Sequence, residues 1–222
     1  MEKRQDARAA LKALCADNVS WDLTPFQGFV DASAARRSAV LVLFGVLDAV
    51  PASAEGPVAG DIDVLLQRRS ASMGHHPGQI SFPGGGVEEG DADITATALR
   101  EAVEETGLDP TGVEILGTLP ELPLVVSNNL VTPVPAWWTR PSQVAAVDSR
   151  ESVDVFRVPV ADLLDPANRA TVVRVWKKST MRSPAFVVQD RVIWGFTAIV
   201  LDLMFEELGW TIPWDRSRQV EP

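Results

Sequence analysis

Three glutamates, Glu101, Glu104 and Glu105, lie close together near the end of a predicted helix. At spacings of i, i+3 and i+4, they would share one side of that helix. Like charges four residues apart repel, and anions in a last helical turn oppose the helix dipole, so this arrangement would lower stability. A hard divalent cation such as Mg²⁺ would remove both penalties because it binds carboxylate oxygens. Two interpretations remain open here, a metal site and a solvated acidic face.

The helix that positions these acids is predicted over residues 92–106. Asp91 or Asp93 would cap its N-terminus, and Gly107 would follow its last turn. A helical wheel places small and apolar residues together on one face, which we expect to pack on a sheet. These residues are Ala92, Ala96, Leu99, Ala102, Val103 and Thr106. The same wheel places the three glutamates on the opposite face.

A glycine-rich segment, residues 74–86, precedes this helix and ends in Phe82-Pro83-Gly84-Gly85-Gly86. Glycine has no Cβ atom, so this backbone can approach a metal or a phosphate closely. A glycine loop alone is a weak signal. A glycine loop followed at a fixed spacing by an acidic helix favours the metal site.

The stretch from Arg100 to Leu108 resembles the second half of the Nudix box, G-x5-E-x7-R-E-U-x-E-E-x-G-U, in which U is apolar. The first half differs. Counting forward from Gly85, the acid falls on Asp91, whereas counting back from Arg100 leads to Ala92. The resemblance implies that this first acid supports the loop and the helix more than the chemistry.

Residues 65–85 resemble the motif that precedes the Nudix box in coenzyme A diphosphatases. The matching residues are Leu65-Leu66-Gln67-Arg68-Arg69-Ser70, then Met73, then residues 76–85. That subgroup also commonly carries the shifted acid seen here as Asp91, but Gly74 stands where it usually has Arg or Gln. With further similar stretches, the resemblance covers residues 37–210.

The resemblance implies the fold, the reaction and the cofactor. The fold would be α/β (α+β), a mixed β-sheet in an α/β/α sandwich. Water would attack the diphosphate of coenzyme A or acyl-CoA, giving 3′,5′-ADP and 4′-phosphopantetheine or its acyl derivative. Mg²⁺ or Mn²⁺ would neutralise the diphosphate and lower the pKa of the bound water.

The resemblance also assigns roles to the charged residues of the helix. Glu101 and Glu105 would bind the metal, with Glu104 as a third ligand. Arg100 would hold one of these carboxylates through a charge-assisted hydrogen bond. The general base stays open between Glu104 and Glu151, which begins a predicted strand.

The substrate would contact the loop and the strand before it. Gly84 and Gly85 are expected near the diphosphate, Gly85 through its carbonyl group or by making the turn. Arg69 is expected to bind a phosphate, since a guanidinium can make two parallel hydrogen bonds. Of the two adjacent histidines, His76 rather than His75 is expected to line the site. Four tryptophans could stack on adenine, although core packing is the commoner role: Trp137, Trp138, Trp176 and Trp194.

Composition narrows the class of protein and its partners. The chain has 222 residues and a formal net charge of −10, which disfavours non-specific binding to nucleic acid. The single cysteine, Cys15, excludes an intrachain disulfide. No apolar run is long enough to span a bilayer and no signal sequence is evident, so we expect a soluble cytoplasmic enzyme with a small-molecule substrate. Many members of the family are dimers, which leaves a homodimer open.

Hydrophobic patterning predicts the remaining elements and the domain limits. Helices are expected at residues 5–17, 160–164 and 195–208. Strands are expected at 38–47, 61–68, 113–118, 131–138, 153–158, 172–176 and 185–188, the first two as a long hairpin. Residues 1–30 would form an extension with a short helix, 31–211 a single catalytic domain, and 212–222 a C-terminal tail.

Three other functions are alternatives to this one. The first is hydrolysis of another nucleoside diphosphate derivative, such as ADP-ribose or NADH, by the same family. The second is isomerisation of a prenyl diphosphate, which typically needs a cysteine or an acid over a carbon site; the position of Cys15 before the first predicted strand argues against it. The third is a non-enzymatic binding module, which predicts loss of the glutamates that are present here.

Overall fold

The computed structural model describes residues 2–17, 19–21, 34–46, 52, 62–71, 77–124, 127–176 and 179–222. The helices are α1 (Glu2–Ala16), α2 (Ile94–Thr106), α3 (Val160–Leu164) and α4 (Phe196–Glu207). The strands of the main sheet are β1 (Arg36–Val46), β2 (Ile62–Arg69), β3 (Ile80–Ser81), β4 (Gly84–Gly86), β5 (Val113–Ile115), β6 (Leu122–Leu124), β7 (Asn129–Trp138) and β8 (Ser152–Pro159). A second sheet contains β9 (Arg169–Trp176), β10 (Ser179–Val188) and β11 (Arg191–Ile193).

The main sheet is mixed. Its central path runs β3-β2-β1-β7-β5, and β4, β6 and β8 pair with β1, β7 and β2. The long strands β1 and β7 are parallel, whereas β2 runs antiparallel to β1 with Val64 opposite Phe44. The predicted hairpin between residues 38–47 and 61–68 is therefore confirmed.

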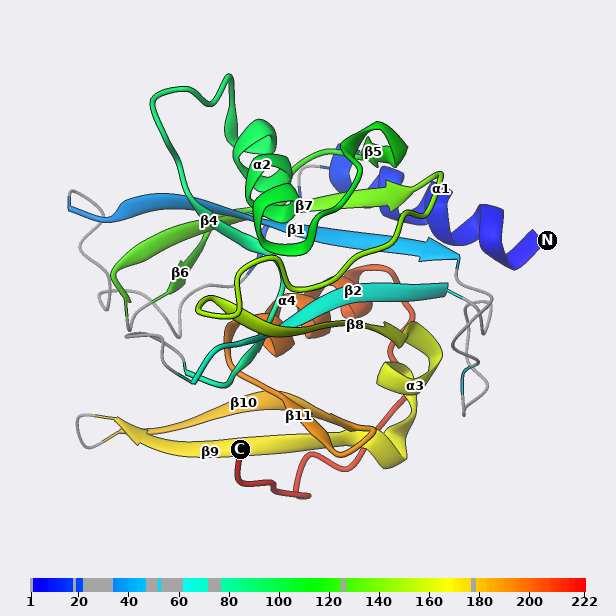
Figure 1. Ribbon diagram of the computed structural model, residues 1–222. Helices are drawn as coiled ribbons and strands as arrows, with labels where there is room; N and C mark the ends of the chain where they lie inside the picture. Colours follow the sequence, from blue (N-terminus) through cyan, green and yellow to red (C-terminus); the bar gives the residue numbers. More distant parts are fainter. Residues whose placement is uncertain are drawn as a thin grey trace.

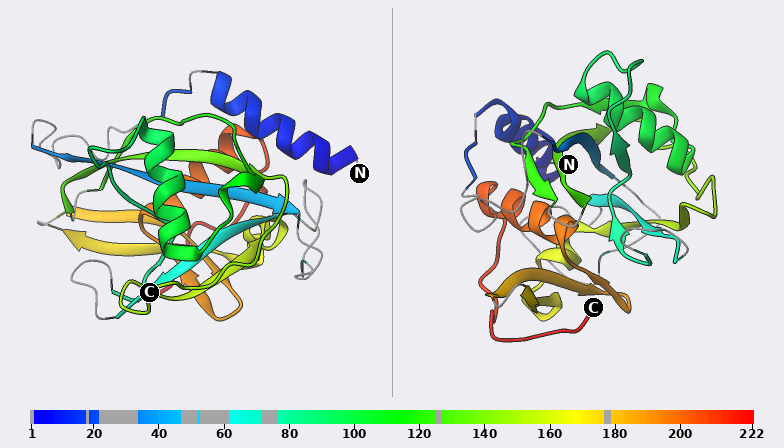
Figure 2. Two further views of the ribbon diagram at one scale, coloured as in Figure 1. Left: turned by 45° about the horizontal axis from the view of Figure 1, so that its top comes forward. Right: turned by 90° about the vertical axis from the view of Figure 1, so that its left-hand side faces the viewer.

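Alternation along β1 gives this sheet two apolar faces. Ala39, Leu41 and Leu43 point toward α2, and Val42 and Phe44 point toward the cluster that contains α4. Figure 1 shows α2 above the sheet and α4 below it, between the main sheet and β10. The apolar side of α1 joins the same cluster as α4, and Figure 2 shows this helix at the margin of the molecule.

The end of the chain covers one position at the edge of the second sheet, through an isolated bridge between Thr171 and Gln219. The amide of Thr171 in β9 donates to the carbonyl of Arg218 at 2.8 Å, and the amide of Val220 donates to the carbonyl of Thr171 at 3.1 Å. Arg169, also in β9, is buried between the rings of Phe186 and Trp214. Trp214 and residues 218–220 thus contact this sheet.

The structure confirms most predicted elements and changes some bounds. α2 begins at Ile94 and not at residue 92, because the Asp93 carboxylate caps the amides of Thr95 and Ala96. The strand predicted at 113–118 ends at Ile115. β3, β4, β6 and β11 were not predicted, since two or three residues show no periodicity. No described helix is long and apolar enough to cross a membrane.

Candidate active site

The face of α2 that packs on the sheet differs from the one the helical wheel predicted. Ala98, Ala102 and Glu105 are buried, so Glu105 lies on the packed face and not opposite it. Its carboxylate can be buried because Oε2 accepts hydrogen bonds from the Gly84 amide at 2.8 Å and from Gln67 Nε2 at 2.6 Å. The prediction that all three glutamates share a face remote from the sheet is wrong.

The three glutamates consequently differ in environment. Glu105 is 7% exposed, and burial raises its pKa to about 7 against the opposing hydrogen bonds from Gly84 and Gln67. Burial also raises the pKa of Glu101, although Arg100 opposes this shift. The Glu104 side chain is 58% exposed. A cation near Glu101 and Glu105 would favour their charged forms.

Arg100 links the helix to the preceding loop. Its Nε and one terminal nitrogen contact the two Asp91 oxygens at 2.9 and 3.0 Å. The other terminal nitrogen contacts Glu101 at 3.0 Å and Glu104 at 3.2 Å. A further hydrogen bond at 2.9 Å reaches the carbonyl of Gly86. One guanidinium therefore fixes two of the glutamates relative to the glycine strand.

Asp91 holds the Arg100 guanidinium in this position. The Arg100 guanidinium lowers the pKa of this carboxyl well below its usual range. Asp91 also accepts hydrogen bonds from the Glu88 amide at 2.9 Å and the Thr97 hydroxyl at 2.8 Å. These contacts tie the loop to the first turns of α2, the supporting position that the sequence predicted.

The glycine strand β4 brings backbone against the acidic helix. β4 pairs with β1, with Gly85 opposite Ala39. A Cβ atom at residue 85 would lie 2.5 Å from Cδ of Glu101, so only glycine leaves room for this carboxylate. Gly84 has φ of 159° and turns its amide toward Glu105.

These residues fit a divalent cation. In the part of the chain that the structure describes, no three acidic, histidine or cysteine side chains converge on one point. The donor chemistry nevertheless suits Mg²⁺ or Mn²⁺, since Glu101, Glu104 and Glu105 offer oxygen ligands on adjacent turns. Because Gly85 has no Cβ atom, the Glu101 carboxylate lies directly against the backbone of β4.

A cavity of about 500 Å³ adjoins the glycine strand. Arg69, at the end of β2, lines this cavity together with Gly84 and Gly85. Trp194 and Phe196, at the start of α4, form part of another wall. The cavity therefore brings a predicted phosphate-binding residue and an aromatic surface next to the backbone that faces the glutamates.

The model of the NUDIX domain family matches residues 56–177 of the chain. This chain belongs to the Nudix family. It is 30% identical to "Nudix hydrolase 15, mitochondrial" of Arabidopsis thaliana over 217 residues, which cover 90% of this chain and 68% of that protein. It is 34% identical to "Uncharacterized Nudix hydrolase NudL" of Enterobacter sp. (strain 638) over 153 residues, 66% of this chain and 75% of that one.

Among solved structures, a MutT/nudix family protein from Enterococcus faecalis matches with 16% identity and a TM-score of 0.47, covering 89% of this chain and 71% of that chain. The predicted Nudix fold, a mixed sheet with helices, is confirmed. The protein is a Nudix hydrolase that acts on a diphosphate, and the family is generally dependent on a divalent metal.

The other predicted site residues of this Nudix hydrolase are less tightly placed. Glu151 is exposed in the loop before β8, and its carbonyl accepts the Ser70 amide at 2.8 Å. The same loop packs on the end of α2, where the Val147 amide donates to the carbonyl of Glu105. His76 lies outside the described residues. Its expected role remains a prediction.

Sequence reasoning missed Gln67, and it did not separate the tryptophans. Gln67 follows Leu65 by two positions in a strand, so its place on the α2 face could have been read from the period of two. Trp137 and Trp138 are buried in the core, as the commoner role predicted. Trp194 lines the cavity. The side chain of Trp176 lies outside the described residues.

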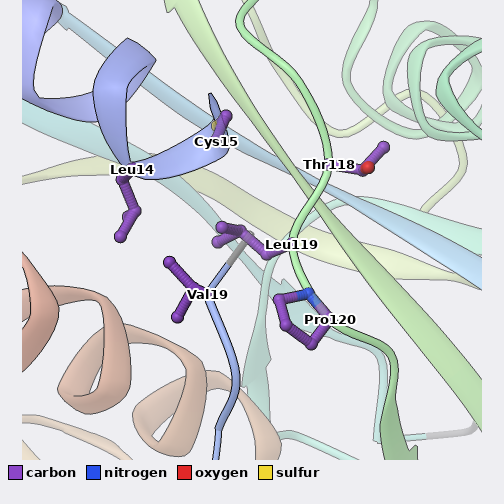
Figure 3. A pocket seen from close by; sticks show the side chains of 6 residues that line it. All are labelled: Leu14, Cys15, Val19, Thr118, Leu119 and Pro120. Atoms are coloured by element: carbon purple, nitrogen blue, oxygen red, sulfur yellow. The ribbon is translucent and has the colours of Figure 1, made fainter. Parts of the chain in front are cut away.

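Cys15 lies in a separate, smaller pocket of about 250 Å³ between the end of α1 and residues 118–120 (Figure 3). The side chains of Leu14, Val19 and Leu119 surround it with apolar groups. Burial raises the pKa of the Cys15 thiol to about 11. The cysteine does not line the larger cavity, so this geometry gives no support to cysteine-dependent isomerisation at the Nudix site.

Proposed function

We propose that this Nudix hydrolase cleaves the diphosphate of coenzyme A or acyl-CoA, releasing 3′,5′-ADP and 4′-phosphopantetheine or its acyl derivative. The observation that carries the proposal is the position of Arg69. This residue belongs to the stretch that resembles the motif of coenzyme A diphosphatases, and it lines the cavity beside Gly84 and Gly85. Arg69 therefore lies beside the glycine strand, and the other side of this strand contacts Glu101 of α2.

Glu101 and Glu105 would hold Mg²⁺ or Mn²⁺, with Glu104 as a third ligand. The ion, when bound, supplies charge neutralisation for the diphosphate and lowers the pKa of a water molecule. Glu105 enters this role already oriented by Gly84 and Gln67. Arg100 restrains Glu101 and Glu104 and therefore acts as a positioning residue.

The remaining roles concern the proton and the substrate. Glu104 or Glu151 would accept the proton of the attacking water, since both are exposed and can reach solvent. Gly84 and Gly85 would lie along the diphosphate because their backbone has no side chain in the way. Arg69 would contact the substrate on the cavity side. His76, which lies outside the described residues, would also contact the substrate. Residues 31–211 would form the catalytic domain.

Product analysis tests this proposal. The purified enzyme is incubated with coenzyme A and Mn²⁺, and the products are separated by chromatography and weighed by mass spectrometry. We expect 3′,5′-ADP and 4′-phosphopantetheine. Parallel reactions contain ADP-ribose or NADH, and a Glu105→Gln variant serves as the control for contaminating activity. Hydrolysis of ADP-ribose without hydrolysis of coenzyme A or acyl-CoA would overturn the proposed substrate.

A further inference from the structure

The start of α4 lies beside the segment that leads into the glycine strand. α4 packs on the face of the main sheet opposite to α2 (Figure 1). Its first two residues, Phe196 and Thr197, line the cavity together with Ile80 of β3. The Thr197 hydroxyl donates a hydrogen bond to the carbonyl of Ile80 at 3.0 Å. One side-chain contact therefore connects the last helix to the strand that precedes the glycine strand.

The Thr197 hydroxyl lies in apolar surroundings. The side chain is 3% exposed, and the other buried residues of α4 are all apolar: Ala198, Val200, Leu201, Met204 and Phe205. A buried hydroxyl costs free energy unless it is hydrogen-bonded, and valine has nearly the same shape without that cost. Thr197 does not cap its own helix, because the N-cap residue is Gly195. Its contact with β3 is therefore the reason for a polar group at this position.

The carbonyl of Ile80 needs a partner from outside the sheet. β3 ends the central path of the main sheet, where it pairs antiparallel with β2. The Arg69 amide donates to the carbonyl of Gln79 at 2.9 Å, on the side of the chain that faces β2. Carbonyls of adjacent residues in a strand point in opposite directions, so that of Ile80 points away from β2. There it accepts the hydrogen bond from Thr197, and β3 is held on both of its edges.

The segment from Ile80 to Gly86 is held from both faces of the main sheet. At its end, Arg100 of α2 contacts the carbonyl of Gly86 at 2.9 Å. At its start, Thr197 of α4 contacts the carbonyl of Ile80. The two helices therefore restrain the same short segment at opposite ends, and a change at either contact alters the path of the backbone between them.

A change in this path would reach Glu105. The Leu41 amide donates to the carbonyl of Pro83 at 2.9 Å, and the next residue, Gly84, donates its amide to Oε2 of Glu105 at 2.8 Å. This second hydrogen bond depends on the direction of one backbone amide, and hydrogen bonds weaken steeply when they bend. Groups that hold a metal ligand by hydrogen bonds control its orientation. A tilt of the backbone after Ile80 would thus misorient the Glu105 carboxylate.

We propose that Thr197 is a positioning residue for the reaction, which holds β3 so that the Gly84 amide orients the Glu105 carboxylate for metal binding. The inference rests on the proposed function of Glu105 as a metal ligand and deepens it. Thr197 acts through the backbone of the segment and not by contact with the glutamates. The start of α4 thereby belongs to the machinery that places a catalytic carboxylate on the opposite face of the sheet.

The test compares the wild type with Thr197→Val, Thr197→Ser and Thr171→Val. Valine removes the hydroxyl and nearly keeps the shape, whereas serine keeps the hydroxyl. Thr171 is the matched control, because it is 5% exposed and its hydroxyl donates to the carbonyl of Arg216 at 2.8 Å, in the second sheet. Calorimetry gives the Mn²⁺ affinity, and thermal unfolding gives the stability. Steady-state kinetics give kcat and KM with coenzyme A, or with ADP-ribose if coenzyme A is not hydrolysed.

We expect Thr197→Val to lower the Mn²⁺ affinity and kcat by about 10-fold each, as for loss of a group that holds a metal ligand. KM for the substrate should change little, because valine preserves the cavity wall. Thr197→Ser should lower the unfolding midpoint through its lost methyl group, and Thr171→Val through its lost hydrogen bond, yet both should keep the Mn²⁺ affinity and kcat of the wild type. If the affinity instead fell in step with the stability in all three variants, the role of Thr197 would be structural alone and the inference would be overturned. Thr197→Ser decides the question if the valine variant does not fold, since a weakened Mn²⁺ affinity in the serine variant would also overturn it.

Hydrogen exchange of the Gly84 amide in the metal-free protein separates this inference from the proposed function. Loss of the hydrogen bond at β3 should raise the exchange rate of this amide by about 10-fold in Thr197→Val, and Thr171→Val should leave the rate unchanged. An unchanged rate in Thr197→Val would overturn the inference. The Mn²⁺ affinity of Glu105→Gln tests the other assignment: an affinity equal to that of the wild type would refute the role of Glu105 as a ligand, whereas the exchange result would stand.

Discussion

Gly85→Ala should disable the enzyme while leaving its fold intact. An ideal Cβ atom at residue 85 lies 2.5 Å from Cδ and Oε1 of Glu101 and 2.6 Å from Oε2. Carbon atoms in contact are normally about 3.5–4.0 Å apart, so the Glu101 carboxylate must move by about 1 Å. The backbone at Gly85 is paired with Ala39 in an ordinary strand, and alanine can adopt that conformation.

Gly85→Ala should change the catalytic rate far more than the stability of the fold. A misplacement of about 1 Å in a catalytic site lowers the rate by about 100-fold. The stability should change by no more than about 1 kcal/mol, since the new methyl group displaces one side chain at a partly exposed position. Binding of the metal should weaken together with turnover, because Glu101 is a proposed ligand.

Three measurements check this prediction. Steady-state kinetics at a series of Mg²⁺ and Mn²⁺ concentrations give the rate and the metal dependence, calorimetry gives Mn²⁺ affinity, and thermal unfolding reports the fold. Gly90→Ala is the matched control, because a Cβ atom there meets nothing within 4 Å. If Gly85→Ala were as active as Gly90→Ala, the position of Glu101 would not matter and the metal assignment would fail.

Three further substitutions probe other parts of the molecule. Glu105→Gln should lower turnover by on the order of 10³-fold, because the charge that binds the metal is lost. Its thermal stability should not change, because the amide oxygen can still accept hydrogen bonds from Gly84 and Gln67. Full activity would contradict the role of Glu105 as a metal ligand. Asp91→Asn should lower kcat by about 10- to 100-fold, since Arg100 loses the charge that orients it; an unchanged kcat would show that Asp91 supports the loop alone. Asp63 is 2% exposed, and burial raises its pKa from 3.8 to about 7. Between these two pH values the folded protein keeps a proton that the unfolded chain releases. The free energy of unfolding therefore falls as pH rises from about 4 to about 7. The free energy of unfolding of Asp63→Asn, measured by chemical denaturation, should equal that of the wild type near pH 4 and exceed it by up to about 4 kcal/mol at pH 8. A difference that stays constant across this pH range would contradict the raised pKa of Asp63.

The order of the elements and the acidic helix could be predicted from the sequence because each long element shows its own hydrophobic period. The orientation of α2 could not. A wheel weights residues by their apolarity, and it placed Glu105 in solvent because a carboxylate is normally exposed. The pairing of Glu105 with Gly84 and Gln67 depends on two segments distant in sequence, and this contact decides which face is buried.

The candidate cavity was also beyond the reach of sequence patterns. Arg69 was expected near a phosphate, but Ser81 and Phe196 carry no local signal of function. They meet because β3 pairs with β2 and because the Thr197 hydroxyl, at the start of α4, donates to the carbonyl of Ile80 at 3.0 Å. Tertiary hydrogen bonds of this kind bring the end of the chain to its middle, and no window of adjacent residues contains them.

The last residues of the chain have a consequence for solubility. By hydrogen bonding to Thr171, residues 218–220 occupy main-chain groups of β9 that would otherwise face solvent. An open strand edge is a template for another chain, so this covering protects the protein from edge-to-edge aggregation. We therefore expect removal of residues 218–220 to leave the Nudix site unchanged and to favour self-association through the uncovered edge of β9.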